Sequence, residues 1–284
     1  MTSLPPAPPV GALADLLRGR RVSVLAGAGI STESGIPDYR GPTTRHVARR
    51  PVQYDEFRRD PEARRRYWAR ASRGWARVAD ARPNVGHRAL AQLEDAGVVT
   101  GVVTQNVDGL HQRAGSRRVV ELHGALADVV CLACERLWPR ADVQAQIAAR
   151  NPGWLDGALP GGAAAPDGDA ELEVAAIARF DPPACPSCGG TLKPDVVFFG
   201  ESVPKPRVAT ARAVVSSSDA LLVVGSSLTV YSGYRFVRQA EAEGTPVAIV
   251  TLGETRGHRH AAVAVDARLG DVLPALADAL CGEG

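Results

Sequence analysis

The sequence of 284 residues contains no apolar run that approaches 18 residues, and it has no marked excess of either charge. The first absence excludes a transmembrane helix, which needs about 20 predominantly apolar residues. Lysine and arginine number 33 against 31 aspartates and glutamates, a formal net charge of +2. Such a balance does not favour nucleic-acid binding as the main activity, so neither a nucleic-acid nor a membrane partner is expected.

A recognisable targeting segment is also missing. Residues 1–10 are rich in proline and show neither the apolar centre of a secretory signal nor the arginine- and serine-rich composition of a transit peptide. Cysteine is scarce: four of the five cysteines form two close pairs, and Cys281 stands alone. This usage is typical of a reducing compartment, so we expect a cytoplasmic protein in which Cys281 is an inert thiol.

What the sequence does contain is an alternation of short apolar strands and helices. With 45% hydrophobic residues, the chain is long enough for one large domain or for one domain with a smaller companion. Continuously apolar strands that alternate with helices predict an α/β fold with a Rossmann-like, doubly wound parallel sheet buried on both faces. Strands are expected at 21–26, 98–104, 118–122, 220–224 and 246–251, and helices at 11–19, 43–80, 83–96, 209–216, 231–243 and 271–280.

Polar and glycine-rich segments follow four of these strands. They cover residues 27–40, 104–111, 225–228 and 251–253. In open parallel sheets, ligands bind beyond the carboxyl ends of the strands. Because the four segments converge on one rim, together they predict a ligand site more strongly than any one of them does alone.

The first two segments have residue types that suit a nucleotide. Gly27-Ala28-Gly29-Ile30-Ser31 allows backbone N–H groups to approach a phosphate, although Thr32 stands where a full dinucleotide fingerprint has its third glycine. A tight structural turn is the alternative. Segment 104–111 offers amides and carboxylates, which hydrogen-bond to sugar hydroxyls or to a carboxamide. A capped turn would use the same residue types.

Three histidines are candidates for a general base. His123 follows the strand at 118–122 and precedes Gly124, so it would lie at the mouth of the cleft, where an imidazole can act as a base near neutral pH. A structural histidine is the alternative. His87 and His111 are rivals by composition, and spacing does not choose among the three.

The two cysteine pairs predict a closed, structural zinc site. Their spacing is C-x2-C-x50-C-x2-C, with ligands Cys131, Cys134, Cys185 and Cys188. The alternative is a thioredoxin-like redox pair with two unrelated cysteines. The tight turn after Cys185, Pro-Ser-Cys-Gly-Gly, favours metal binding. Four thiolates leave zinc without an open position for substrate, so the site is expected to hold the fold.

Taken together, these motifs resemble the sirtuin family over about residues 11–280. They occur in the sirtuin order and include Gly27–Ser31, Gly35-Ile36-Pro37-Asp38-Tyr39-Arg40, Thr104–Asp108, His123-Gly124, the four cysteines, Pro194–Glu201 and Gly225–Leu228. Tyr67-Trp68-Ala69-Arg70, Gly74-Trp75 and the long insert between the cysteine pairs look most like the class II branch.

The resemblance implies an NAD-dependent protein lysine deacylase that consumes NAD and releases nicotinamide and 2′-O-acyl-ADP-ribose. His123 would be the base for a ribose hydroxyl, Asn106 would orient the nicotinamide ribose and a water, and Asp108 would bind the carboxamide. The other implied NAD contacts are Gly27, Ala28, Gly29, Ile30, Ser31, Thr32, Glu33, Gly35, Ile36, Pro37, Asp38, Tyr39, Arg40, Gln105, Val107, Gly225, Ser226, Ser227, Thr251, Leu252, Gly253 and Leu269.

The same resemblance implies a domain division and a peptide partner. Residues 11–42, 84–124 and 200–284 would form the Rossmann-like NAD-binding domain, residues 43–83 a helical module, and residues 125–199 a zinc-binding module of the small domain. An acyl-lysine peptide would add as a strand along Val196–Gly200. Two departures concern the residues near the adenosine. Thr251 stands where sirtuins usually have Asn, and Leu269 stands where related chains often have Cys.

Three activities fit this sequence. The first is NAD-dependent deacylation, with acetyl, longer or lipoyl-like groups. The second is mono-ADP-ribosyl transfer, or lipoamidase activity, at the same NAD site. The third is a non-catalytic module that senses NAD or ADP-ribose. Thr251 is its one support, and His123, Asn106 and Asp108 argue against it.

Overall fold

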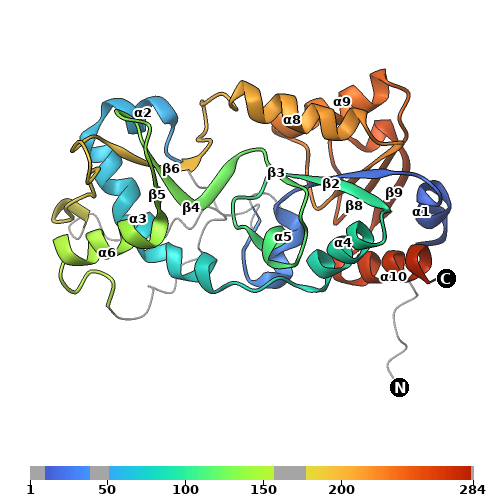
Figure 1. Ribbon diagram of the computed structural model, residues 1–284, viewed down its shortest axis with the longest axis horizontal. Helices are drawn as coiled ribbons and strands as arrows, with labels where there is room; N and C mark the ends of the chain where they lie inside the picture. Colours follow the sequence, from blue (N-terminus) through green and yellow to red (C-terminus); the bar gives the residue numbers. More distant parts are fainter. Residues whose placement is uncertain (1–9, 39–50, 157–176, 283–284) are drawn as a thin grey trace.

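The computed structural model describes residues 10–38, 51–156 and 177–282. Its larger sheet is parallel throughout and has six strands in the order β3-β2-β1-β7-β8-β9 (Figure 1). The predicted α/β fold with a parallel sheet is therefore confirmed. The strands are β1 (Val22–Ala26), β2 (Val99–Thr104), β3 (Val119–Glu121), β7 (Ala220–Val224), β8 (Val247–Thr251) and β9 (Ala261–Asp266).

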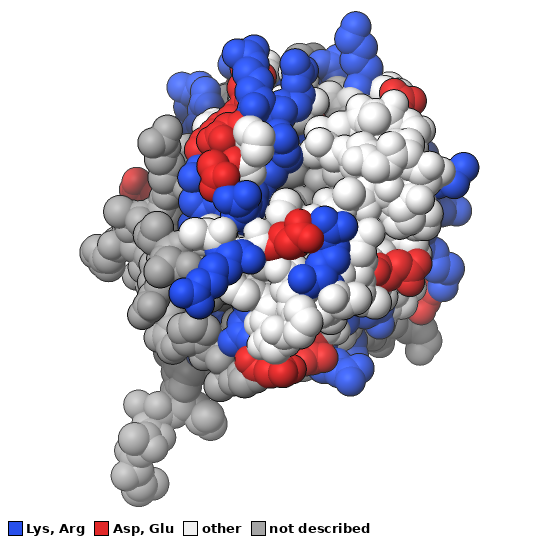
Figure 2. All heavy atoms as spheres, turned by 90° about the vertical axis from the view of Figure 1, so that its left-hand side faces the viewer, with Lys and Arg blue, Asp and Glu red and all other residues white. Residues whose placement is uncertain are grey.

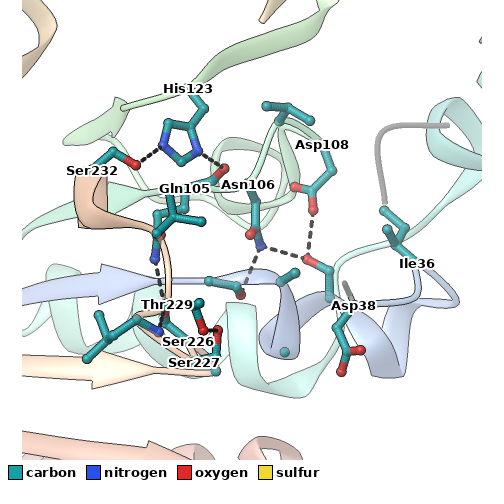
Figure 3. Close-up of a pocket in the computed structure, with 18 of the residues that line it drawn as sticks. Ile36, Asp38, Gln105, Asn106, Asp108, His123, Ser226, Ser227, Thr229 and Ser232 are labelled. Atoms are coloured by element: carbon teal, nitrogen blue, oxygen red, sulfur yellow. Dashed lines mark hydrogen bonds between the residues drawn. The ribbon is translucent and has the colours of Figure 1, made fainter. Parts of the chain in front are cut away.

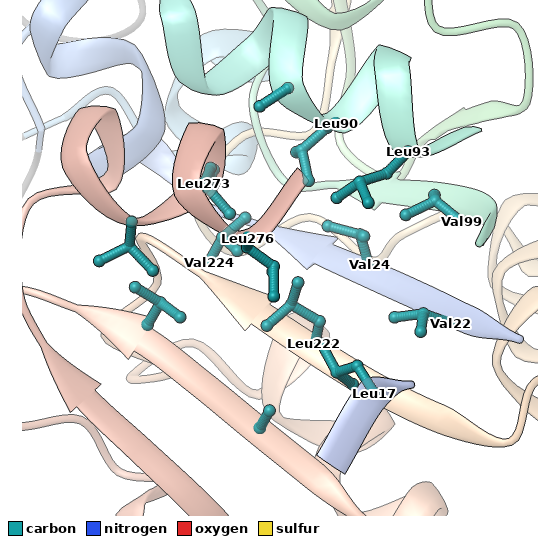
Figure 4. Close-up of a cluster of buried hydrophobic side chains, with 14 of the residues drawn as sticks. Leu17, Val22, Val24, Leu90, Leu93, Val99, Leu222, Val224, Leu273 and Leu276 are labelled. Atoms are coloured by element: carbon teal, nitrogen blue, oxygen red, sulfur yellow. The ribbon is translucent and has the colours of Figure 1, made fainter. Parts of the chain in front are cut away.

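Helices cover both faces of this sheet because successive strand side chains point to opposite sides. Leu222 and Val224 of β7 pack with one set of helices, whereas Leu221 and Val223 pack with the other. Figure 4 shows the first of these cores. The first set is α1 (Val10–Leu17), α4 (Val85–Asp95) and α10 (Leu269–Cys281), and the second is α8 (Lys205–Ser216) and α9 (Tyr231–Ala242).

A second, smaller body is built on three antiparallel strands in the order β5-β4-β6. These are β4 (Gly124–Cys131), β5 (Leu137–Pro139) and β6 (Leu192–Val196), and helices α2 (Tyr54–Arg59), α3 (Pro61–Asp80) and α6 (Arg140–Arg150) pack beside them (Figure 1). Trp68 of α3 is buried and donates a hydrogen bond from its ring nitrogen to the carbonyl of Leu192 at 3.1 Å. The predicted smaller companion is thus a separate sheet with its own apolar core.

The arginine-rich stretch forms two helices within residues 51–80. The break lies at Asp60, whose carboxylate caps α3 by accepting from the backbone N–H of Glu62 at 2.8 Å, and Pro61 follows at the first helical position. Arginines here are close to acidic side chains, as in Arg65–Glu62 at 2.6 Å. Figure 2, which faces this end of the molecule, accordingly shows acidic side chains among the basic ones.

Several elements were not predicted. β9 alternates between partly exposed and exposed side chains until Val265, so it lacks the apolar run of a buried strand. β4, β5, β6 and α6 lie in the cysteine-bearing region, for which no element was predicted. Helix α8 begins at Lys205 and not at 209. In the described part of the chain, no helix is long and apolar enough to cross a membrane. The three-part domain division stays a prediction.

The central strand β7 generates a stability prediction. Leu222 is fully buried between helices, whereas Leu137 on β5 is 59% exposed. Replacing Leu222 by alanine is expected to lower the free energy of unfolding by about 2–5 kcal/mol, because the surrounding core cannot fill the cavity. Leu137→Ala is the matched control and should change it by about 0.5 kcal/mol or less. Denaturant unfolding followed by circular dichroism compares the two, and equal losses would contradict this core assignment.

Candidate active site

One cleft of about 1270 Å³ lies at the carboxyl ends of strands β1, β2, β7 and β8 (Figure 3). All four loops that the sequence singled out contribute to its wall, and so does His123. The predicted residues that line it are Gly27, Ala28, Gly29, Ser31, Thr32, Glu33, Gly35, Ile36, Pro37, Asp38, Gln105, Asn106, Val107, Asp108, Gly225, Ser226, Ser227, Thr251, Leu252, Gly253 and Leu269.

Three of the predicted cofactor residues do not line the cleft or cannot be placed. Ile30 is 1% exposed, and its side chain belongs to the core. Tyr39 and Arg40 lie outside the described residues. Thr251 and Leu269, the two departures from the sirtuin pattern, both line the cleft. Both substitutions therefore lie where the adenosine of NAD is expected to bind.

Three glycines bring the loops after β1 and β7 into contact. Gly29 donates a backbone hydrogen bond to the carbonyl of Gly225 at 2.8 Å. A Cβ atom on Gly27 or Gly29 would lie 2.7–2.8 Å from backbone or side-chain atoms of Gly225 and Ser226, closer than real Cβ atoms come. Gly225 also has a φ of 61°, a left-handed conformation that favours glycine. The close contact between the two loops requires glycine at these positions, and it leaves only backbone atoms at the floor of the cleft.

A chain of hydrogen bonds fixes the polar groups after β2. The side-chain amide of Asn106 donates to the carbonyl of Gly27 at 3.2 Å and to the hydroxyl of Ser31 at 3.1 Å. Ser31 donates in turn to the carboxylate of Asp108 at 2.7 Å, and the other carboxylate oxygen accepts from the backbone N–H of Leu110 at 2.9 Å. The orientation of Asn106 and Asp108 is therefore set before any ligand binds.

His123 lies where the chain passes from the parallel sheet to the antiparallel one. Its Nδ1 lies 3.0 Å from the carbonyl oxygen of Gln105 and its Nε2 lies 2.8 Å from the hydroxyl of Ser232 (Figure 3). Because a carbonyl can only accept, Nδ1 carries the proton in this arrangement. Gly124 follows with a φ of 82°, and a Cβ there would overlap the carbonyl oxygen of Asp195, so a glycine is required at this crossing.

The surroundings of His123 keep its ring neutral near pH 7. Burial lowers its pKa below the ordinary value, the hydrogen bond to Gln105 opposes that shift, and the charges of Arg235 and Arg207 lower the pKa further. A neutral imidazole that is protonated at Nδ1 has its basic lone pair at Nε2. This nitrogen points to Ser232 at the start of α9.

The rival histidines are not part of the cleft. His87 and His111 are each at most 1% exposed, and their rings meet edge to face with centroids 5.0 Å apart. Burial is the main reason that the pKa of each lies well below its usual range, and for His87 the neighbouring His111 is the second. They are therefore core residues, and His123 is the histidine that faces the cleft.

Sequence reasoning missed part of the cleft wall. Tyr231, Ser232 and Arg235 line it from the first turns of α9, and Tyr67 lines it from α3. No local pattern places them at the cleft, because they come from ordinary amphipathic helices that meet it only in the folded chain. The apolar stretch 196–200 that was predicted to take a peptide lines the cleft as well.

The four paired cysteines come together as predicted. Their sulfur atoms lie within 4.8 Å of one another, with 3.6 Å between Cys131 and Cys188 and 3.8 Å between Cys134 and Cys185. A tetrahedral zinc with Zn–S bonds of about 2.3 Å separates its sulfurs by roughly 3.8 Å, which matches the two shortest separations. None of the four forms a disulfide. The arrangement is consistent with a structural zinc.

Comparison with known proteins decides the family. The model of the Sir2 family matches residues 27–232. The chain belongs to the Sir2 family. NAD-dependent protein deacetylase 1 of Mycobacterium avium is 54% identical over 270 residues, which is 94% of each chain. The protein of the same description from Streptomyces coelicolor is 52% identical over 94% of this chain and 89% of its own length.

Solved structures agree with this Sir2 assignment. A Sir2 structure with a p53 peptide and NAD⁺ has a TM-score of 0.74 and 31% identity, over 94% of this chain and 96% of that one. A mutant Sir2 homologue in complex with ADP-ribose has a TM-score of 0.75 and 28% identity over 96% of each chain. The six-stranded parallel sheet with a small antiparallel sheet and four-cysteine cluster is therefore the sirtuin fold.

The thiol cluster generates a prediction about metal. This Sir2 protein is expected to carry about one zinc per chain, and Cys131→Ser should lose it together with the order of the small sheet, since zinc affinity contributes directly to folding. Cys281→Ser is the matched control, because that thiol lies outside the cluster, and it should keep its zinc. Metal analysis and circular dichroism report both effects. A chelated wild-type protein that stays fully folded would refute the structural role.

The buried histidine pair generates a prediction about pH. Because the folded-state pKa values of His87 and His111 are lowered, the unfolded chain binds more protons once the pH falls below about 6.5. Stability should thus decrease with acidification, by up to about 1.4 kcal/mol per pH unit for each histidine. His111→Leu should flatten this dependence in urea titrations between about pH 6.5 and 4.5. Parallel curves for the variant and the wild type would contradict it.

Proposed function

We propose that this cleft is where the chain, an NAD-dependent protein deacetylase of the Sir2 family, binds NAD and an acylated lysine. The observation that supports it best is the convergence of the predicted NAD residues with His123 on one cavity. In the reaction of the family, the acyl oxygen of the lysine attacks the nicotinamide ribose as nicotinamide leaves. The products are the free lysine and 2′-O-acyl-ADP-ribose.

On this proposal the glycine-lined floor holds the pyrophosphate. The close approach of Gly29 to Gly225 leaves no side chain between the two loops, so backbone N–H groups of Gly27–Ser31 can reach phosphate oxygens. Ser226, Ser227 and the loop 251–253 would contact the adenosine half. The Thr251 hydroxyl can donate or accept a hydrogen bond, so we expect an altered ribose contact there and not a lost one.

We assign the general base to His123, acting at Nε2. A ribose hydroxyl that reaches Nε2 takes the place of the Ser232 hydroxyl and transfers its proton there, while Nδ1–H stays on the carbonyl of Gln105. The resulting imidazolium still donates a hydrogen bond from Nδ1 to the carbonyl of Gln105, which stabilises its positive charge. A lowered pKa means that the base is already unprotonated at neutral pH.

Asn106 and Asp108 are proposed to position the nicotinamide end of NAD. Ser31 joins them, since it accepts from the Asn106 amide and donates to the Asp108 carboxylate. A rigid amide and carboxylate can orient a ribose and a carboxamide without rearranging as the reaction proceeds. Asn106 is 8% exposed, which suits a group that excludes bulk water.

The peptide is proposed to lie over His123, along the edge strand β6 and the stretch after it. β6 pairs with β4 on one side only, so its other edge can accept a strand. The backbone N–H of Val197 donates to the carbonyl of His123 at 2.8 Å, which ties the end of this strand to the proposed base. A Sir2 structure with a p53 peptide supports a peptide ligand.

Two finer proposals rest on sequence. We propose the class II branch because of the Tyr67–Arg70 and Gly74-Trp75 stretches and the long insert between the cysteine pairs. This leaves longer or lipoyl-like acyl groups open beside acetyl. A cytoplasmic location is proposed because clustered cysteines without a disulfide are typical of a reducing compartment.

The test of the proposed base uses acetyl-lysine peptide, NAD and nicotinamide release. His123→Ala should slow steady-state release over many turnovers by about 100-fold or more, the usual contribution of a general base, while NAD binding stays measurable by calorimetry. His258→Gln is the matched control, because His258 lies outside the cleft. A His123→Ala protein that binds NAD and releases nicotinamide at the wild-type steady-state rate would refute the assignment.

The same reaction mixtures distinguish the proposed activity from its alternatives. Acetyl-, succinyl-, lipoyl- and myristoyl-lysine peptides define the acyl group, and mass spectrometry identifies the products. O-acyl-ADP-ribose would support deacylation. A protein that gains ADP-ribose without loss of the acyl group would instead indicate ADP-ribosyl transfer.

A further inference from the structure

The first turns of α9 form one wall of the cleft beside His123. Ser232 contacts Nε2 of His123 at 2.8 Å, and Arg235 follows three residues later, on the same side of the helix. Arg235 also lines the cleft, and its charge contributes to lowering the pKa of His123. The guanidinium group is therefore close to the place where the acyl-lysine is proposed to react.

Arg235 has no acidic partner among the described residues. Its carbon Cζ lies 5.3 Å from the ring centroid of Tyr231, one turn earlier, and its buried Nε has no hydrogen-bond partner in the described part of the chain. Arg238, one turn later on the same helix, behaves differently, because it pairs with Glu241 at 3.1 Å and lies outside the cleft.

Three other cations near the cleft are each paired with a carboxylate. Arg268 lies 3.4 Å from Glu33, and Arg207 pairs with Asp195. Glu201, across the cleft, pairs with the buried Lys193 at 3.0 Å. Arg235 is thus a cation held on the cleft wall by an aromatic ring, with its donors turned to no carboxylate of the described chain. Such a group favours an anionic ligand, and arginine suits carboxylates in particular.

The position of Arg235 indicates whether NAD or the acyl-peptide supplies the anionic group that it binds. The peptide is proposed to lie in a channel between the stretch 196–200 and the first turn of α9. Both walls of this peptide channel form a hydrogen bond with His123, one from the backbone N–H of Val197 and the other through the hydroxyl of Ser232. The pyrophosphate of NAD is assigned to the glycine floor between the loops after β1 and β7. A carboxylate at Arg235 therefore belongs to the acyl-peptide.

We propose that Arg235 is a specificity residue that selects acyl-lysine substrates with a carboxylate next to the reacting amide. This rests on the proposed function, since it takes the peptide to lie over His123. The carboxylate has two sources: an acidic side chain that flanks the lysine, or the free end of a dicarboxylic acyl group. Tyr231, which is 59% exposed, supplies the apolar surface beside it.

The experiment compares matched substrates with the full-length chain and NAD. In one arm, the substrates are pairs of acetyl-lysine peptides. The two members of a pair differ only in having Glu or Gln at one position, which is one or two residues before or after the lysine. In the other arm, a neutral peptide carries succinyl-lysine or butyryl-lysine. The readout is the ratio of kcat/KM for nicotinamide release within each pair. This ratio does not depend on the fraction of folded protein, so a poorly folding variant still gives a valid answer.

The wild type should prefer the acidic member of at least one pair by about five- to tenfold, the range of a partly exposed charge-assisted hydrogen bond. Arg235→Gln should reduce that ratio to about one, and Arg235→Glu should reverse it in favour of the uncharged member of the pair. Arg238→Gln, the matched loss of charge on the same helix, should keep the wild-type ratio. The preference should weaken with added salt.

Two outcomes would overturn the inference alone. One is a wild type that turns over the peptides without any preference for acidic members in either arm, and the other is a preference that Arg235→Gln leaves intact. A wild type that releases no nicotinamide from any acyl-peptide would overturn the proposed function as well, which separates the two failures. The arm in which the preference appears identifies the source of the carboxylate.

Discussion

The site depends on the hydrogen bonds that hold His123 between two sheets. β3 ends at Glu121 and β4 begins at Gly124, so the chain leaves one sheet and enters the other within two residues. The carbonyl of Gln105, directly after β2 of the parallel sheet, accepts a hydrogen bond from Nδ1 of His123, and the carbonyl of His123 accepts one from the N–H of Val197, directly after β6 of the small sheet. The same contacts that fix the imidazole therefore join the NAD floor to the peptide channel, and neither half can shift without moving the base.

The centre of the large sheet could be predicted because its inner strands are buried on both faces. β1 and β7 are apolar at nearly every position, and such runs between glycine turns have few other interpretations. The position of the ligand site could be predicted from the topology. The carboxyl ends of all strands in a parallel sheet lie at the same edge, so the polar residues after β2 lie close to the glycines after β1. Cys131 and its three partners were predictable because thiol spacing reflects metal geometry directly.

The rest could not be predicted because it depends on contacts between distant segments. β9 is an edge strand with exposed side chains, so burial left no apolar pattern in its sequence. Ser232 and Arg235 belong to a helix whose pattern only reports which face is buried. That its other face meets His123, more than 100 positions earlier in the chain, is a property of the assembled fold. Histidine composition likewise favoured none of three candidates until His87 and His111 were found buried.

The separation of zinc from the chemistry follows from β4 itself. Cys131 is the last residue of this strand and Gly124, next to His123, is the first. β4 bulges between Ala125 and Val129, so the partners of Cys131 and Gly124 on β6, Leu192 and Val196, are only four positions apart. Four residues of strand span roughly 13 Å, which still keeps the thiolates out of contact with His123. Zinc can still act on the cleft, since it fixes the end of β4 against the turn that leads into β6, and both strands reach the His123 crossing. Its influence on activity is therefore mechanical, through the register of two paired strands.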